Sequence, residues 1–135
     1  MTNRRRWIVA GLALAWLAPG LAAAQDQNQR KKGGGASFIQ LDTVTATVTR
    51  LDGRRGVMTV EVGVDVADSA LHARAAQSTP LLHAAYAEIV RTYAAGLPPG
   101  APPSADYLSM QLQRQTDLTL GRPGAKLLLG TIILN

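Results

Sequence analysis

The side chains best suited to catalysis or metal binding in this sequence are its two histidines, His72 and His83. A zinc or iron site needs three or four converging donors, and because the chain has no cysteine, carboxylates would have to join both histidines. His72 stands four residues after Asp68, a spacing that predicts a surface pair on a helix, while His83 follows apolar Leu82 and is predicted to be partly buried. We therefore expect no metal, no cofactor and no catalytic residue.

The serines and the glycine-rich segment at 52–56 give no stronger indication of chemistry. No serine lies in a Gly-x-Ser-x-Gly elbow, and three of them stand where helices would need a capping hydroxyl: Ser69, Ser78 and Ser104. The segment 52–56 reads Asp-Gly-Arg-Arg-Gly, but it joins two expected strands and precedes no helix, unlike a phosphate-binding loop. Arg54 and Arg55 would lie at the tip of that hairpin, where they are either solvated or grip an acidic patch on a protein partner.

Charge is unevenly distributed along the 135 residues. The chain carries 14 Lys and Arg against 9 Asp and Glu, a net charge of +5, yet residues 38–135 hold eight basic and eight acidic side chains. A neutral domain has no field that attracts phosphates, so we expect no nucleic-acid partner.

Residues 1–24 have the three parts of an export signal. A basic start is followed by an uncharged run over 7–24, and Ala22 and Ala24 form the A-x-A arrangement that predicts cleavage before Gln25. The run is also long enough for an uncleaved membrane anchor, which is the alternative. We expect a periplasmic protein that is held at the inner membrane only if the signal is retained.

The start of this signal carries a more specific pattern. Arg4 and Arg5 are followed, after one further residue, by apolar Trp7 and Ile8. This order is typical of a twin-arginine signal, and it predicts passage through the Tat translocase.

After the signal, residues 25–37 are polar and end in a glycine run, which predicts a flexible linker before a single domain at 38–135. Apolar residues alternate over 43–49 and again over 58–66, with turn residues between, so the two segments predict a long hairpin. The polar positions of the first strand predict either a wet sheet face or an edge that another copy could pair with: Thr43, Thr45, Thr47 and Thr49.

Two or three helices should follow the hairpin. Asp68 or Ser69 caps a short one, Ser78 caps the main one to about Ala95, and Ser104 caps one that ends at Leu120 before Gly121. In the main helix the expected inward residues are Leu82, Tyr86, Ile89 and Tyr93, supported by Ala85 and Val90. In the last helix they are Tyr107, Leu108, Leu112 and Leu118. The apolar run 127–134 predicts a strand buried on both faces. The class is α+β, with a mainly antiparallel sheet covered by two to three helices.

This layout resembles a known family. The segments that carry the likeness are Phe38–Asp42, Val60–Val66, Pro80–Val90, Tyr107–Leu120 and Leu127–Asn135. Together they resemble the FliL family of flagellar basal-body-associated proteins. The resemblance implies a periplasmic α+β domain without catalysis, one that self-associates and contacts the stator units of the flagellar motor.

Two alternatives remain open from the sequence. FliL-like proteins usually keep a transmembrane helix, whereas a cleaved signal would give a free periplasmic paralogue unrelated to motility. A carrier of a small apolar or lipid ligand is the other alternative, with polar contacts between helices and sheet supplied by Tyr86, Tyr93, Gln111 and Gln115.

Overall fold

The computed structural model describes residues 35–135. Most of the predicted linker lies outside the described residues. So do the residues of the predicted export signal and its cleavage site: Arg4, Arg5, Trp7, Ile8, Ala22, Ala24 and Gln25. The elements follow in the order β1 (Phe38–Gln40), β2 (Val44–Thr49), β3 (Arg55–Val66), α2 (Ser69–Gln77), α3 (Thr79–Gly96), α4 (Ala105–Leu120) and β4 (Ala125–Leu134).

Strand β3 is the centre of an antiparallel sheet. Along one side it pairs with β2, from Arg55 opposite Thr49 to Val60 opposite Val44, and then with β1. Along the other side it pairs with β4, from Met58 opposite Leu134 to the pair at 66 and 125. The predicted hairpin is confirmed, and its turn contains Gly53 at φ 81°, a backbone conformation that glycine adopts without steric cost.

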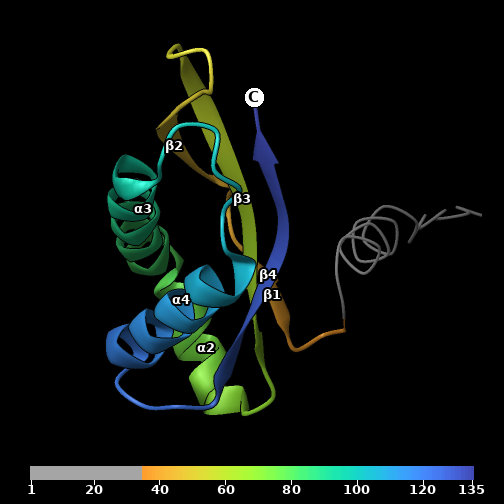
Figure 1. The fold of residues 1–135 in the computed structure, drawn as a ribbon. Helices are drawn as coiled ribbons and strands as arrows, with labels where there is room; N and C mark the ends of the chain where they lie inside the picture. Colours follow the sequence, from red (N-terminus) through yellow and green to blue (C-terminus); the bar gives the residue numbers. More distant parts are fainter. Residues whose placement is uncertain (1–34) are drawn as a thin grey trace, which may run out of the picture.

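The three helices of residues 35–135, α2, α3 and α4, cover the same face of this sheet (Figure 1). The inward side chains of β3 are at most 1% exposed, as its alternation predicted: Met58, Val60, Val62, Val64 and Val66. On the opposite face Thr45, Thr47 and Thr49 are exposed, so the threonines form a wet face. Among residues 35–135 β2 pairs with β3 alone, so the alternative of an open edge also holds for this strand. An α+β fold with an antiparallel sheet is therefore confirmed.

Local signals set most helix ends. The Asp68 carboxylate accepts a hydrogen bond of 2.8 Å from the Leu71 N–H, and Ser104 Oγ accepts from the Tyr107 N–H. Ser78 is the N-cap residue of α3 with a proline in the first turn, as predicted, but the predicted capping hydrogen bond from its side chain is not formed. Helix α2 runs almost directly into α3, which leaves Ser78 at φ −99° and ψ 9° instead of the extended backbone that aims a capping hydroxyl.

The buried stripes of the two long helices differ in part from the prediction. In α3 they are Leu82, Tyr86, Val90 and Ala94, with Ile89 and Tyr93 half-buried beside them; in α4 they are Leu108, Leu112, Thr116 and Leu120. Tyr107 and Leu118, expected inside, are 45% and 69% exposed. The stripe of α4 includes Thr116 because its hydroxyl is hydrogen-bonded to the buried Tyr86 hydroxyl, which gives a polar group a place in the core.

Strand β4 was expected inside the sheet, and that prediction is wrong. Within residues 35–135 it pairs with β3 alone, so it is an edge strand. Its first half is buried on the helix side through Ala125 and Leu127, whereas Ile133 and Leu134 are 44% and 43% exposed. The second half of the apolar run 127–134 is thus partly exposed, and the strand is not buried on both faces.

Candidate functional site

The tip of the β2–β3 hairpin projects beyond the helices at one end of the molecule (Figure 1). Two backbone hydrogen bonds join its ends, from the Arg50 N–H to the Arg54 carbonyl (2.7 Å) and from the Gly53 N–H to the Arg50 carbonyl (2.9 Å). Asp52 Oδ1 accepts from the Arg54 N–H at 3.0 Å. The one carboxylate side chain in this turn therefore holds the turn's backbone together.

The arginines of the hairpin are exposed, and none forms a salt bridge with another residue of the described chain: Arg50, Arg54 and Arg55. Arg54 and Arg55 were predicted from the sequence as partner contacts, whereas Arg50, which lies against β3, was not. A Cβ atom built on Gly56 would come within 3.0 Å of Arg50 Cγ. The Arg50 side chain also lines a cleft together with Leu134 and Asn135, at the end of β4.

Apolar side chains are exposed around the same arginines. Leu51 is 85% exposed and lines the same cleft as Leu134, at the end of β4 on the helix side of the sheet. Val57 is 45% exposed and lies on the other face, because its side chain alternates with that of the buried Met58. Single exposed apolar residues are ordinary, but a group of them beside unpaired arginines is typical of protein-binding surfaces. We call the end of the hairpin the tip surface; it includes Arg50, Leu51 and Leu134 on the helix side, Arg55 and Val57 on the other face, and Arg54 in the turn between the strands.

A cleft of about 450 Å³ opens on the helix side of the tip surface. Leu97, Gly100 and Ala101, from the loop between α3 and α4, form one wall. Leu51 and Leu134 form part of the other. The loop is held at this position by the Gly100 N–H, which donates to the Thr49 carbonyl at 3.2 Å.

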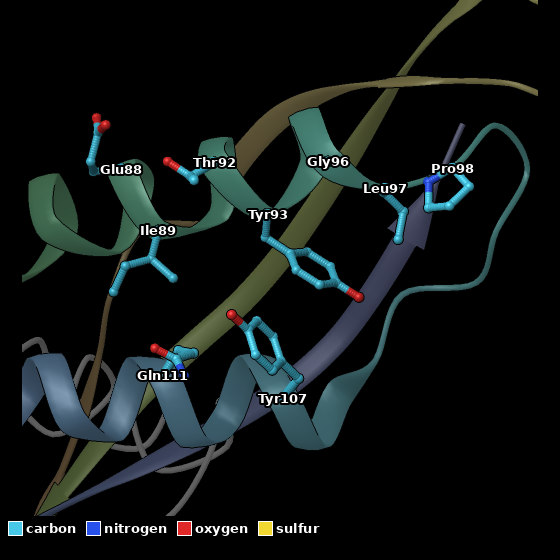
Figure 2. Close-up of a pocket in the computed structure, with 9 residues that line it drawn as sticks. All are labelled: Glu88, Ile89, Thr92, Tyr93, Gly96, Leu97, Pro98, Tyr107 and Gln111. Atoms are coloured by element: carbon cyan, nitrogen blue, oxygen red, sulfur yellow. The ribbon is translucent and has the colours of Figure 1, made fainter.

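A second concave region lies between α3 and α4 (Figure 2), with a volume of about 580 Å³. Figure 2 shows Tyr93 and Tyr107 turned toward one another across it; their ring centroids are 5.5 Å apart and the rings are stacked. Tyr93 Oη accepts from the Ser104 N–H at 2.7 Å, and Gln111 and Ile89 complete the floor. We call this region the interhelical groove.

Of the four polar residues predicted for a ligand pocket, Tyr93 and Gln111 line the interhelical groove and the other two do not. Tyr86 is fully buried, and burial raises the pKa of its phenol. Gln115 donates instead to Thr119 Oγ1 at 3.1 Å. The predicted pocket residues thus divide between the groove and the core.

The histidines lie on different helices, and neither pairs with a carboxylate of residues 35–135. His83 Nε2 donates to the Thr43 carbonyl at 3.2 Å, consistent with the predicted partly buried site beside the sheet. The predicted pair of His72 with Asp68 is wrong, because that carboxylate accepts from the Leu71 N–H and from Arg122. In the part of the chain that the structure describes, no group of three or more His, Asp or Glu side chains could hold a metal ion.

Comparisons with known proteins identify no relative of this chain. No protein-family model, curated protein or solved structure matches the sequence. Among residues 35–135, no helix combines the length and the apolar character needed to cross a membrane.

Two features of the site were missed by sequence reasoning. Leu134 and Leu51 were read as core and turn, and their exposure beside the arginines depends on where β4 ends relative to the hairpin. A long-range pairing such as Met58 with Leu134 sets that relation, and no local pattern in the sequence encodes it.

Proposed function

We propose that this chain is a non-enzymatic, exported domain that works by binding another protein through the tip surface. The observation that carries the proposal is the set of exposed arginines that form no salt bridge within residues 35–135, at the same end of the molecule as exposed Leu51, Val57 and Leu134. Arginine is enriched in protein interfaces because its planar guanidinium pairs with carboxylates in two-point geometry. Exposed leucines beside it supply the apolar area that an ion pair alone lacks.

The resemblance to the FliL family indicates which partner to test first. In that version of the proposal, the export signal delivers the domain to the periplasm, where it contacts the flagellar stator or another copy of itself. A free periplasmic paralogue unrelated to motility would use the same surface for a different acidic partner.

The proposal is tested by titrating the protein, purified from its host in the form the host makes, with the purified periplasmic segment of the stator protein from the same organism. We expect Arg54→Glu to weaken binding at least tenfold, about 1.4 kcal/mol, because it places a carboxylate against an acidic surface. The matched control is Arg114→Glu, the same charge change at an exposed position of α4. Equal affinities of the two variants would contradict binding at the tip surface.

The interhelical groove supports a second candidate, the carrier of a small apolar ligand. Its volume of about 580 Å³ suits a small molecule, and Tyr93 and Gln111 offer polar contacts beside Ile89 and Leu97. Native mass spectrometry of the protein from its host tests this function directly. A retained small molecule that is lost in Gln111→Leu would favour it, and a bare polypeptide mass would count against it.

A further inference from the structure

The outer edge of β4 is closed over its first half by a side chain of α4. Gln113 Nε2 donates to the Ala125 carbonyl and Gln113 Oε1 accepts from the Leu127 N–H, both at 2.8 Å. One primary amide thus occupies the donor and acceptor that a neighbouring strand would use. Because an unpaired strand edge readily accepts another strand, this contact protects that half of the edge.

Among the described residues, none pairs with the second half of the same edge. Val57 and Asn135 exchange two backbone hydrogen bonds, of 2.9 and 3.0 Å, so Asn135 turns its backbone groups toward β3. Since these groups alternate along an antiparallel strand, those of Leu134 and Ile132 point away from β3. Within the described residues no hydrogen bond reaches them.

Charge changes sign along this open half. At its end Arg50 lines a cleft with Leu134 and Asn135, and Arg55 and Arg54 follow in the hairpin beyond the pair of Val57 with Asn135. None of these arginines forms a salt bridge among the described residues. At its beginning, the Glu61 carboxylate lies over the bulge of β4 and accepts from the Thr131 N–H at 3.4 Å. A segment lying along the edge would therefore meet positive charge near residue 134 and negative charge near residue 131.

We propose that a partner protein adds an extended segment to β4 along residues 129–134, antiparallel to it, with acidic side chains at the segment's N-terminal end and apolar ones after them. The proposal rests on the proposed function and specifies how the partner is held. Backbone hydrogen bonds to Ile132 and Leu134 supply the pairing, and the arginines of the tip surface receive the acidic end. Antiparallel pairing is slightly more stable per residue than parallel pairing. In an antiparallel pair the N-terminal end of the partner segment lies beside residue 134, close to the arginines, so this is the end that should be acidic.

The probe is a synthetic peptide with a run of glutamates followed by alternating valine and threonine, titrated into the protein purified from its host. Amide hydrogen exchange by NMR reports the site directly. We expect the N–H groups of Ile132 and Leu134 to exchange rapidly in the free protein and at least tenfold more slowly with the peptide bound. A peptide with lysines in place of glutamates should bind at least tenfold more weakly, as should one N-methylated at alternate residues.

Two variants separate the backbone from the side chain at the centre of this edge. Ile132→Pro removes the outward N–H, a position where an edge strand tolerates proline because no bond to β3 is lost. Ile132→Val keeps the N–H and nearly the same volume. We expect the peptide to bind Ile132→Val as it binds the parent protein and to bind Ile132→Pro at least tenfold more weakly; circular dichroism verifies that both variants fold.

The results also separate this inference from the proposed function. Peptide binding without protection of the Ile132 and Leu134 amides would overturn strand addition, and so would the absence of peptide binding. In either case, an effect of Arg54→Glu on stator binding would leave the tip surface standing as the contact site. Equal binding of the lysine peptide would overturn the acidic preference on which the assignment of the segment depends.

Discussion

Gln113 and Leu127 are 14 residues apart in the chain, and the N–H of Leu127 donates to the side-chain amide of Gln113 at 2.8 Å. The same amide group bonds the Ala125 carbonyl, so it stands in for a strand beside β4. A helix that lies over the sheet therefore also closes part of the sheet's edge.

Replacing Gln113 with leucine should open this part of the edge. The backbone groups at 125 and 127 would lose their partners, at a cost of about 1–2 kcal/mol in the free energy of unfolding. The open edge should also make the protein self-associate as its concentration rises. Urea unfolding and analytical ultracentrifugation measure the two effects. Gln115→Leu is the control, because Gln115 bonds Thr119 and not β4; equal behaviour of both variants would contradict the role of Gln113.

The hydroxyls of Tyr86 and Thr116 should behave as a coupled pair. Thr116 Oγ1 donates to the Leu112 carbonyl at 2.7 Å, so the Tyr86 O–H donates to Thr116. Thr116→Val should cost about 1–3 kcal/mol, because it leaves a buried phenol without an acceptor. In a Tyr86→Phe background the same change should cost about 1 kcal/mol less. Urea unfolding of the four proteins measures this coupling, and additive effects would show that the hydroxyls act independently.

Asp68 should make stability depend on pH in the acid range. The Leu71 N–H, followed by Arg122, holds the pKa of its carboxyl below the ordinary value of 3.8. A lowered pKa in the folded state means that the carboxylate stabilises the fold above pH 3.8 and that this contribution is lost as pH falls through the lowered value. Asp68→Ala should therefore be less stable than the parent protein at neutral pH.

The difference in stability between Asp68→Ala and the parent protein should become smaller as the pH falls. Urea unfolding midpoints measured across the acid range report this difference. Asp68→Asn keeps an acceptor for the Leu71 N–H and does not titrate, so its advantage over Asp68→Ala should persist at low pH. A gap to the parent protein that stayed constant with pH would contradict the assignment.

Gly63 should be required for the seating of β1 on β3. A Cβ atom at this position would enter the space of the Phe38 ring and lie 3.0 Å from the Ile39 carbonyl oxygen. We expect Gly63→Ala to cost about 1–3 kcal/mol in urea unfolding. The cost should be smaller in a Phe38→Ala background, where the ring is gone. An equal cost in both backgrounds would place the strain at the backbone of Ile39.

Features set by neighbouring residues were predictable from the sequence. The alternation from Met58 to Val66 placed β3, and Asp68, Ser104 and Gly121 marked helix ends, because each acts within a turn or two of its own position. The hydroxyl of Ser78 was predicted to cap α3 and does not. A capping side chain also needs an extended backbone, and Ser78 does not have one because α2 and α3 are joined so closely.

Features that depend on distant partners were not predictable. Thr116 reads as a surface residue until Tyr86, on another helix, lies beside it. The apolar run of β4 fits a central strand and an exposed edge equally well, and only the absence of a further strand beside it in the described chain decides between them. For the site, Arg54 and Arg55 were selected from the hairpin alone, whereas the free backbone at Ile132 required the register of β4.

The register between β3 and β4 also bears on when the domain can fold. Met58 pairs with Leu134 and Val66 pairs with Ala125. One side of β3 therefore has no hydrogen-bonded partner strand until β4, which is synthesised much later, is available. Pairings this distant in sequence slow folding, because the loop between them must close before they form. A chain emerging from the ribosome would hold β3 half paired until residues 125–134 appear, and an export route that accepts folded cargo would suit a domain that completes its sheet only then.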